Sequence, residues 1–167
     1  MTSFCLPSDK TSRFRLLPLV PVVVIALVLD QFTKWLIMRE FPVGGGMVVI
    51  PGFFDLVHFR NTGAAFGVLA GGHIPWRLYF FLGMTPIALI IILWLYIRTQ
   101  ASDQLQRWSL SLIFGGASGN FVDRLIHGEV VDFLYFYVGS FHWPAFNVAD
   151  SCISVGCVLL LISILRS

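Results

Sequence analysis

Two aspartates near the C-terminal end are the residues best suited to acid–base chemistry. Asp132 and Asp150 bracket a run rich in Phe, Tyr and Trp, and each adjoins strongly apolar sequence. Two carboxylates held close together in a low-dielectric setting cannot easily both ionise, so they share one proton. The deprotonated carboxylate then takes a proton from water, and the protonated one polarises a carbonyl. This pattern predicts an aspartic peptidase, and it also fits a proton relay in a transporter.

Further polar residues lie inside apolar segments, where charged side chains are usually functional or paired. Helical spacing places Asn120, Asp123 and Arg124 on one face, and an internal ion pair between Asp123 and Arg124 is a hypothesis from their proximity. Asp30 and Lys34 are spaced i, i+4, which predicts a paired anchor with a structural role.

The sequence does not predict a metal site, a covalent nucleophile or nucleic-acid binding. The four histidines and three cysteines show no zinc spacing, and no serine lies in a GxSxG context. The formal net charge of +2 comes without a basic cluster. We therefore expect no metal, no cofactor and no nucleic-acid partner.

The composition is that of an integral membrane protein. Hydrophobic residues make up 57% of the 167-residue chain and charged residues 12%, against about 25% charged in a soluble domain. Four continuous apolar segments predict membrane-crossing helices in a single domain that covers residues 1–167. They span residues 16–38, 76–97, 108–126 and 146–165, and the third is the weakest by hydropathy.

Charge distribution sets the expected orientation. Basic residues outnumber acidic ones before residue 16, between 98 and 107, and after 165, which predicts both termini in the cytoplasm. The first span is expected to stay in place as an anchor, because no small-x-small cleavage site follows it. The loops 39–75 and 127–145 then face outward. The second of these loops would act as a hairpin that returns the chain, bringing Asp132 and Asp150 to one depth near the outer interface.

The outer loop 39–75 is long for a connection between helices, so we expect it to be structured. Turn signals occur at residues 44–46 and 51–52, and the alternation at residues 57–60 predicts a half-buried strand. Residues 63–71 predict a short interfacial helix. In the third span, Gly115 and Gly119 form a small-xxx-small pattern that predicts close helix packing.

Five blocks in order resemble the lipoprotein signal peptidase family, also called signal peptidase II. The blocks are DQFTK (30–34), FRNTGAAFG (59–67), GGASGNFVDR (115–124), VVDF (130–133) and PAFNVADS (144–151). The resemblance implies an all-α enzyme of the bacterial inner membrane with four transmembrane helices, a small extracytoplasmic β-cradle and a short interfacial helix. It implies cleavage of diacylglyceryl-modified prolipoproteins just before the lipidated cysteine, and inhibition by globomycin.

The same resemblance assigns roles to residues of this sequence. It implies that Asp132 and Asp150 form the catalytic dyad, and that Asp30 is structural. Substrate-binding or site-shaping roles are expected for Asn61, Asn120, Asp123, Arg124 and Asn147. Membrane lipids are expected partners and a monomer is the expected state. Two alternatives stay open at this point: a proton-coupled transporter using the same acids, and a non-catalytic membrane assembly factor.

Overall fold

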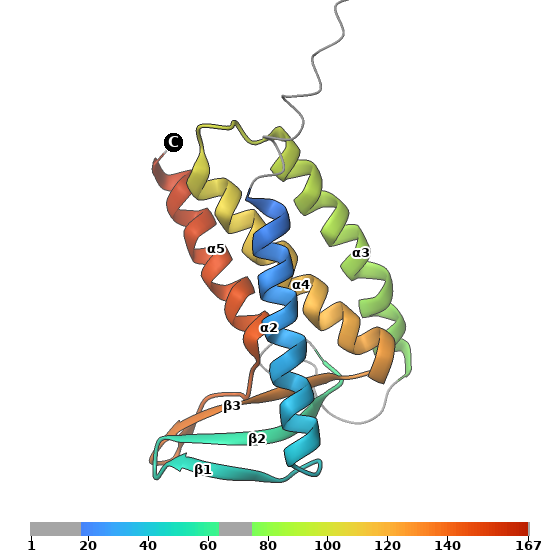
Figure 1. Ribbon diagram of the computed structural model, residues 1–167, viewed down its shortest axis with the longest axis vertical. Coiled ribbons are helices and arrows are strands. Elements are labelled where there is room, and N and C mark those ends of the chain that lie inside the picture. Colours follow the sequence, from blue (N-terminus) through green and yellow to red (C-terminus); the bar gives the residue numbers. More distant parts are fainter. Residues whose placement is uncertain (1–17, 64–74, 167) are drawn as a thin grey trace, which may run out of the picture.

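The computed structural model describes residues 18–63 and 75–166. In this part of the chain, four long helices form a bundle that stands on a small antiparallel sheet (Figure 1). The helices are α2 (Leu19–Glu40), α3 (Pro75–Arg98), α4 (Gln104–His127) and α5 (Val148–Arg166). They confirm the four predicted helices to within about four residues at each end. The interfacial helix predicted at 63–71 lies, apart from its first residue, outside the described residues.

Three of the helices are long and apolar enough to cross a membrane, and α4 is not among them. The reason lies in its position: α4 contacts α2, α3 and α5, and it packs most extensively against α5. Its polar side chains therefore face protein rather than lipid, and ten of its residues are buried. The weak hydropathy of residues 108–126 is the signature of a helix that is enclosed by others.

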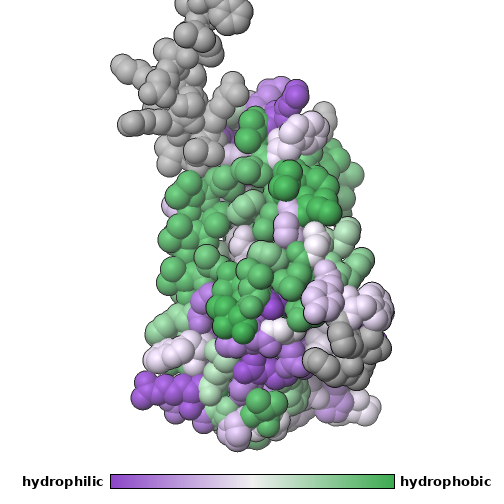
Figure 2. Space-filling model, turned by 90° about the vertical axis from the view of Figure 1, so that its right-hand side faces the viewer, coloured by the Kyte–Doolittle hydropathy of each residue, from purple (hydrophilic) through white to green (hydrophobic). Residues whose placement is uncertain are grey.

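The outer faces of the other three helices are apolar. Large hydrophobic side chains such as Ile25 on α2, Ile90 on α3 and Leu161 on α5 are more than half exposed. On the face that Figure 2 shows, hydrophobic residues predominate over the helical part, while hydrophilic ones gather toward the sheet. Burying such faces in a bilayer removes a large apolar area from water. The described chain thus has the surface of a membrane protein.

Glycines let α4 approach its neighbours closely. A Cβ added at Gly115 would lie 2.9 Å from the Cβ of Ala26 on α2, and one at Gly156 of α5 would lie 2.6 Å from Ile113 Cγ1 on α4. An added Cβ fits at neither position unless the neighbouring atoms shift. The packing interpretation of the small-xxx-small pattern is confirmed for Gly115.

The sheet has four strands in the order β1-β2-β3-β4, all antiparallel. They are β1 (Gly46–Ile50), β2 (Phe54–Asn61), β3 (Val130–Val138) and β4 (Phe141–His142). The strand predicted at residues 57–60 is confirmed as part of β2. The hairpin predicted within 127–145 is present as the antiparallel pair of β3 and β4, although no bounds for these strands were predicted from the sequence. The β-branched and aromatic residues of VVDFLYFYV favour a strand.

Two connections bring the elements of the site together. Gly128 ends α4 in the left-handed region, with φ of 75°, and its N–H donates to the carbonyl of Arg124. The chain can therefore turn directly into β3. Beyond β4, Phe146 pairs with Leu134 through backbone hydrogen bonds just before α5 begins. The end of α4, the start of β3 and the start of α5 are thereby fixed beside one another.

Candidate active site

Asp132 lies on β3 with its carboxylate held from two sides. Asn61 and Asn147 each donate a side-chain N–H to it at 2.8 Å. The strand register explains the first bond: Phe59 is opposite Asp132, so Asn61 is its diagonal neighbour on the same face. Only 3% of Asp132 is exposed to solvent.

Burial raises the pKa of Asp132 from its ordinary value near 3.8 to about 7, and the charge of nearby Asp150 adds to the rise. Removal from water disfavours the charged carboxylate, and a like charge disfavours it further. The hydrogen bonds from Asn61 and Asn147 act in the opposite direction but do not prevent the rise. Asp132 therefore sits where a carboxyl group can exchange a proton near neutral pH.

Asp150 lies in the first turn of α5 and is 2% exposed. Asn147 caps this helix, because its side-chain oxygen accepts the Asp150 backbone N–H at 2.9 Å. The sequence Asn-Val-Ala-Asp fits an N-cap followed by an acid three residues later. Asn120 of α4 donates its side-chain N–H to the Asp150 carboxylate at 2.8 Å.

The two asparagines join the aspartates into one cluster. The side-chain N–H of Asn147 that reaches Asp132 also lies 3.2 Å from the side-chain oxygen of Asn120, and Asn120 in turn donates to Asp150. An unbroken chain of hydrogen bonds therefore runs from Asp132 to Asp150. The structure brings these two sequence-predicted acids together, as the predicted hairpin required.

Lys34 on α2 contacts a second set of buried polar groups. Its ammonium group lies 2.8 Å from Asp30 and 2.9 Å from Asp123, and it donates to the side-chain oxygen of Asn120 at 3.1 Å. The predicted pairing of Asp30 with Lys34 is confirmed. The hypothesis that Asp123 pairs with Arg124 is wrong, because successive helical residues point in different directions and Asp123 faces α2.

Arg124 instead binds backbone oxygen and an aromatic ring. Its guanidinium donates to the carbonyl of Gly63 at 2.7 Å and to that of Asn120 at 3.3 Å. It also lies over the ring of Phe81 on α3, 4.5 Å from the centroid. These contacts tie the end of α4 to α3 and to the chain just beyond β2.

Some members of the cluster were not predicted from the sequence. Gln31 donates its side-chain N–H to Asp123 at 2.8 Å and to Asp30 at 3.2 Å. The available signal was its position in the DQFTK block, between Asp30 and Lys34. Two backbone groups, the N–H of Ala149 and the carbonyl of Gly63, also take part and could not be identified from side-chain types.

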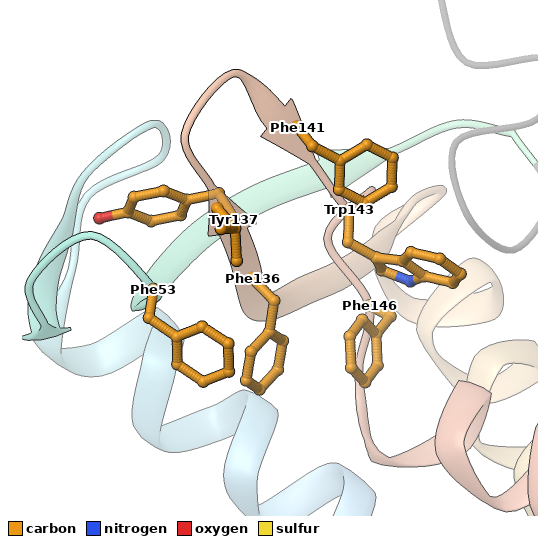
Figure 3. A pocket seen from close by; sticks show the side chains of 7 residues that line it. Phe53, Phe136, Tyr137, Phe141, Trp143 and Phe146 are labelled. Atoms are coloured by element: carbon orange, nitrogen blue, oxygen red, sulfur yellow. The ribbon is translucent and has the colours of Figure 1, made fainter.

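An aromatic pocket of about 310 Å³ lies on the sheet (Figure 3). Its lining comes from the turn before β2, from β3 and β4, and from the segment that leads to α5: Phe53, Phe136, Tyr137, Val138, Phe141, Trp143 and Phe146. Phe136 lies four residues after Asp132 on β3, and Phe146 immediately precedes Asn147. The pocket and the acidic cluster are therefore linked through β3 and through the segment that leads into α5.

The chain matches a known family over most of its length. The family described as signal peptidase (SPase) II matches residues 22–166. The chain belongs to the signal peptidase II family. The match includes every residue of the cluster described above, and it confirms the family resemblance seen in the five sequence blocks.

Curated relatives within the family are named lipoprotein signal peptidases. The protein of Syntrophotalea carbinolica is 46% identical over 154 residues, covering 92% of this chain and 93% of the relative. That of Cupriavidus taiwanensis is 49% identical over 145 residues, covering 86% and 80% of the two chains. A solved structure described as a bacterial membrane enzyme is 35% identical, with a TM-score of 0.79 over 88% of this chain and 87% of the other.

Proposed function

We propose that this signal peptidase II family member removes the signal peptide of diacylglyceryl-modified prolipoproteins by aspartic acid–base hydrolysis. Asp132 and Asp150 are the proposed catalytic pair, and cleavage falls just before the lipidated cysteine. The observation that carries the proposal is the hydrogen-bonded chain that joins these two buried carboxylates through Asn147 and Asn120. Family membership supplies the substrate class, since the relatives are named lipoprotein signal peptidases.

The proposed reaction needs one proton on the carboxyl pair. The ionised carboxylate removes a proton from water while the water oxygen attacks the scissile carbonyl carbon. The protonated carboxyl gives its proton to the carbonyl oxygen, which produces a neutral tetrahedral intermediate. The intermediate then collapses: the C–N bond breaks, the leaving nitrogen receives a proton from the pair, and the signal peptide leaves with a new carboxyl group. The raised pKa of Asp132 supports such a singly protonated pair near neutral pH.

Arg124, Asn61 and the aromatic pocket are the proposed substrate contacts. Asn61 donates to Asp132 and accepts the Gly63 N–H, so it links the pair to the chain segment that Arg124 also binds. An extended peptide in a dry site needs hydrogen-bond partners for its backbone, and the Asn61 amide and the Arg124 guanidinium carry groups of that kind. The exposed apolar residues of β1, from Met47 to Ile50, support contact of the sheet with membrane lipid.

We propose that all four helices cross the bacterial inner membrane, with both termini in the cytoplasm and the sheet outside. The sheet and both ends of the described chain lie at opposite ends of the bundle (Figure 1). Arg98, Arg107 and Arg166 belong to the end away from the sheet, which fits the positive-inside rule. The low hydropathy of α4 does not oppose a fourth crossing, because three other helices shield its polar residues from lipid.

The test is cleavage of a purified diacylglyceryl-modified prolipoprotein by the protein in lipid. We expect wild type to cleave, globomycin to inhibit, and Asp132→Asn to lose at least about 100-fold in rate, as general acid–base groups contribute that much or more. Asp103→Asn is the matched control, because Asp103 caps the far end of α4. Turnover by folded Asp132→Asn at the rate of the control variant would refute the proposal.

A further inference from the structure

Two buried carboxylates outside the proposed catalytic pair bind the backbone directly beside it. Asp30 accepts the N–H of Ala149 at 2.9 Å, and Ala149 immediately precedes one catalytic aspartate. Asp123 accepts the N–H of Val131 at 3.1 Å, and Val131 immediately precedes the other. In both cases a buried carboxylate accepts the backbone N–H of the residue before a proposed catalytic aspartate, once on helix α5 and once on strand β3.

Lys34 connects the two carboxylates, Asp30 and Asp123, to each other. An ammonium group has three N–H donors, and Lys34 directs them at Asp30, Asp123 and the side-chain oxygen of Asn120. Asn120 then donates to Asp150. Helices α2 and α4 thereby meet strand β3 and helix α5 at one buried point.

The bond to Ala149 has a role beyond neutralising charge. The first N–H groups of a helix have no partner inside it, and Asn147 satisfies only the one at Asp150. Asp30, from a different helix, satisfies the preceding N–H and brings a negative charge to the helix N-terminus. The orientation of this first turn sets the direction in which the next side chain, that of Asp150, leaves the backbone.

We infer that Asp30, Lys34 and Asp123 form a positioning unit that sets the separation and orientation of the Asp132 and Asp150 carboxyl groups. The inference rests on the proposed function of that pair. It assigns Asp123 to the backbone of β3 rather than to substrate, and it gives Asp30 and Lys34 a part in turnover beyond anchoring α2. Catalytic groups must be held close to the productive geometry, and a misplacement of about 1 Å costs on the order of 100-fold in rate.

Gly119 offers a way to disturb the unit without removing a polar group. A Cβ at Gly119 would lie 2.5 Å from Asp30 Oδ2, so alanine there must displace that carboxylate. Gly115 is one turn away on the same helix, and its Cβ would meet Ala26 on α2 at 2.9 Å instead. Gly119→Ala and Gly115→Ala are therefore matched substitutions at the same interface between α2 and α4, and only the first touches the unit.

The experiment measures kcat and KM separately for the two glycine variants in lipid. Size-exclusion chromatography and thermal melting determine the folded fraction of each variant. For Gly119→Ala we expect kcat to fall about 10- to 100-fold, with KM within about twofold of wild type. For Gly115→Ala we expect a lower melting temperature with kcat unchanged. Equal kcat values for the two folded variants would overturn the inference, because a merely structural role predicts equal loss.

A second pair of variants keeps the test decisive if Gly119→Ala does not fold. Asn can still accept the Ala149 N–H at position 30, and Ala cannot. We expect Asp30→Asn to retain a kcat at least about 10-fold above that of Asp30→Ala, with similar KM values. Equal kcat values for these two variants would contradict a positioning role through the Ala149 N–H.

A readout that does not use activity separates this inference from the proposed function. Amide hydrogen exchange should report faster exchange at Ala149 in Asp30→Ala and at Val131 in Asp123→Ala than in wild type. If wild type cleaves no prolipoprotein yet both amides lose protection, the proposed function fails and the backbone contacts stand. If wild type cleaves and the exchange rate of neither amide changes, the positioning unit is refuted and the proposed function stands.

Discussion

Replacing Asp132 by Asn should change how the stability of the protein depends on pH. The Asp132 carboxyl is buried beside Asp150, and its pKa in the folded protein is about 7 against an ordinary value of 3.8. It binds its proton more tightly in the folded state than in the unfolded state. Folding therefore takes up a proton between about pH 4 and pH 7, and the free energy of unfolding falls as pH rises through that window.

The size of the effect follows from the two pKa values. Linkage gives a loss of roughly 1.3 kcal/mol per pH unit in the middle of the window, and about 2.6 kcal/mol between pH 5 and pH 8. Asn has no proton to take up, so Asp132→Asn removes this dependence. The variant also loses one of the bonds from Asn61 or Asn147, since an amide offers one acceptor oxygen where the carboxylate offers two. That loss shifts stability at every pH and leaves the predicted slope unaffected.

The assay is denaturant unfolding in mixed micelles at pH 5 and pH 8, followed by tryptophan fluorescence. The predicted result is that the stability of wild type relative to Asp132→Asn falls by about 2.6 kcal/mol on going to pH 8. Asp55→Asn is the control, because Asp55 lies on the neighbouring strand and bonds Tyr137 outside the cluster. A stability difference between wild type and Asp132→Asn that does not change with pH would show that the Asp132 carboxyl takes up no proton on folding.

Three further substitutions test other parts of the structure. Asn147→Ala removes the cap of α5 and a bond to the proposed catalytic pair. We expect a loss of about 1 kcal/mol in unfolding free energy from the cap alone together with a lower kcat, and an unchanged kcat would contradict the bridging role. Arg124→Gln leaves the Gly63 carbonyl without its 2.7 Å partner, which should cost about 1–3 kcal/mol; a melting temperature equal to wild type would count against this contact. Ile90→Arg places a charge on the exposed face of α3, which should disfavour insertion by about 3 kcal/mol; an equal yield in the membrane fraction would show that this face does not meet lipid.

The helices and the proximity of the two acids could be predicted from the sequence because both depend on short-range rules. Continuous apolar runs identify the spans, and i, i+4 spacing predicted the Asp30–Lys34 pair that the structure contains. The return of the chain between two helices brought Asp132 near Asp150. The Asn-Val-Ala-Asp sequence also carried the local signal for the start of α5.

Contacts between distant segments could not be predicted in the same way. The aromatic segment of β3 forms a strand because it pairs with β2, which lies about 70 residues earlier in the sequence. The sequence around β3 does not identify that partner. The partner of Asp123 was misassigned because Lys34 is far away in sequence and is brought close only by helix packing. Glycine at 119 looked like one more packing residue, although its lack of a Cβ makes space for the Asp30 carboxylate.

The proposed proteolytic role of Asp132 and Asp150 is best tested by the identity of the cleavage product. A diacylglyceryl-modified prolipoprotein would be incubated in lipid with wild type or with Asp150→Asn, and the mature chain would be analysed by mass spectrometry. We expect a new N-terminus at the lipidated cysteine with wild type and intact substrate with Asp150→Asn. Intact substrate with folded wild type, or the same new N-terminus formed at an equal rate by Asp150→Asn, would contradict the proposed role.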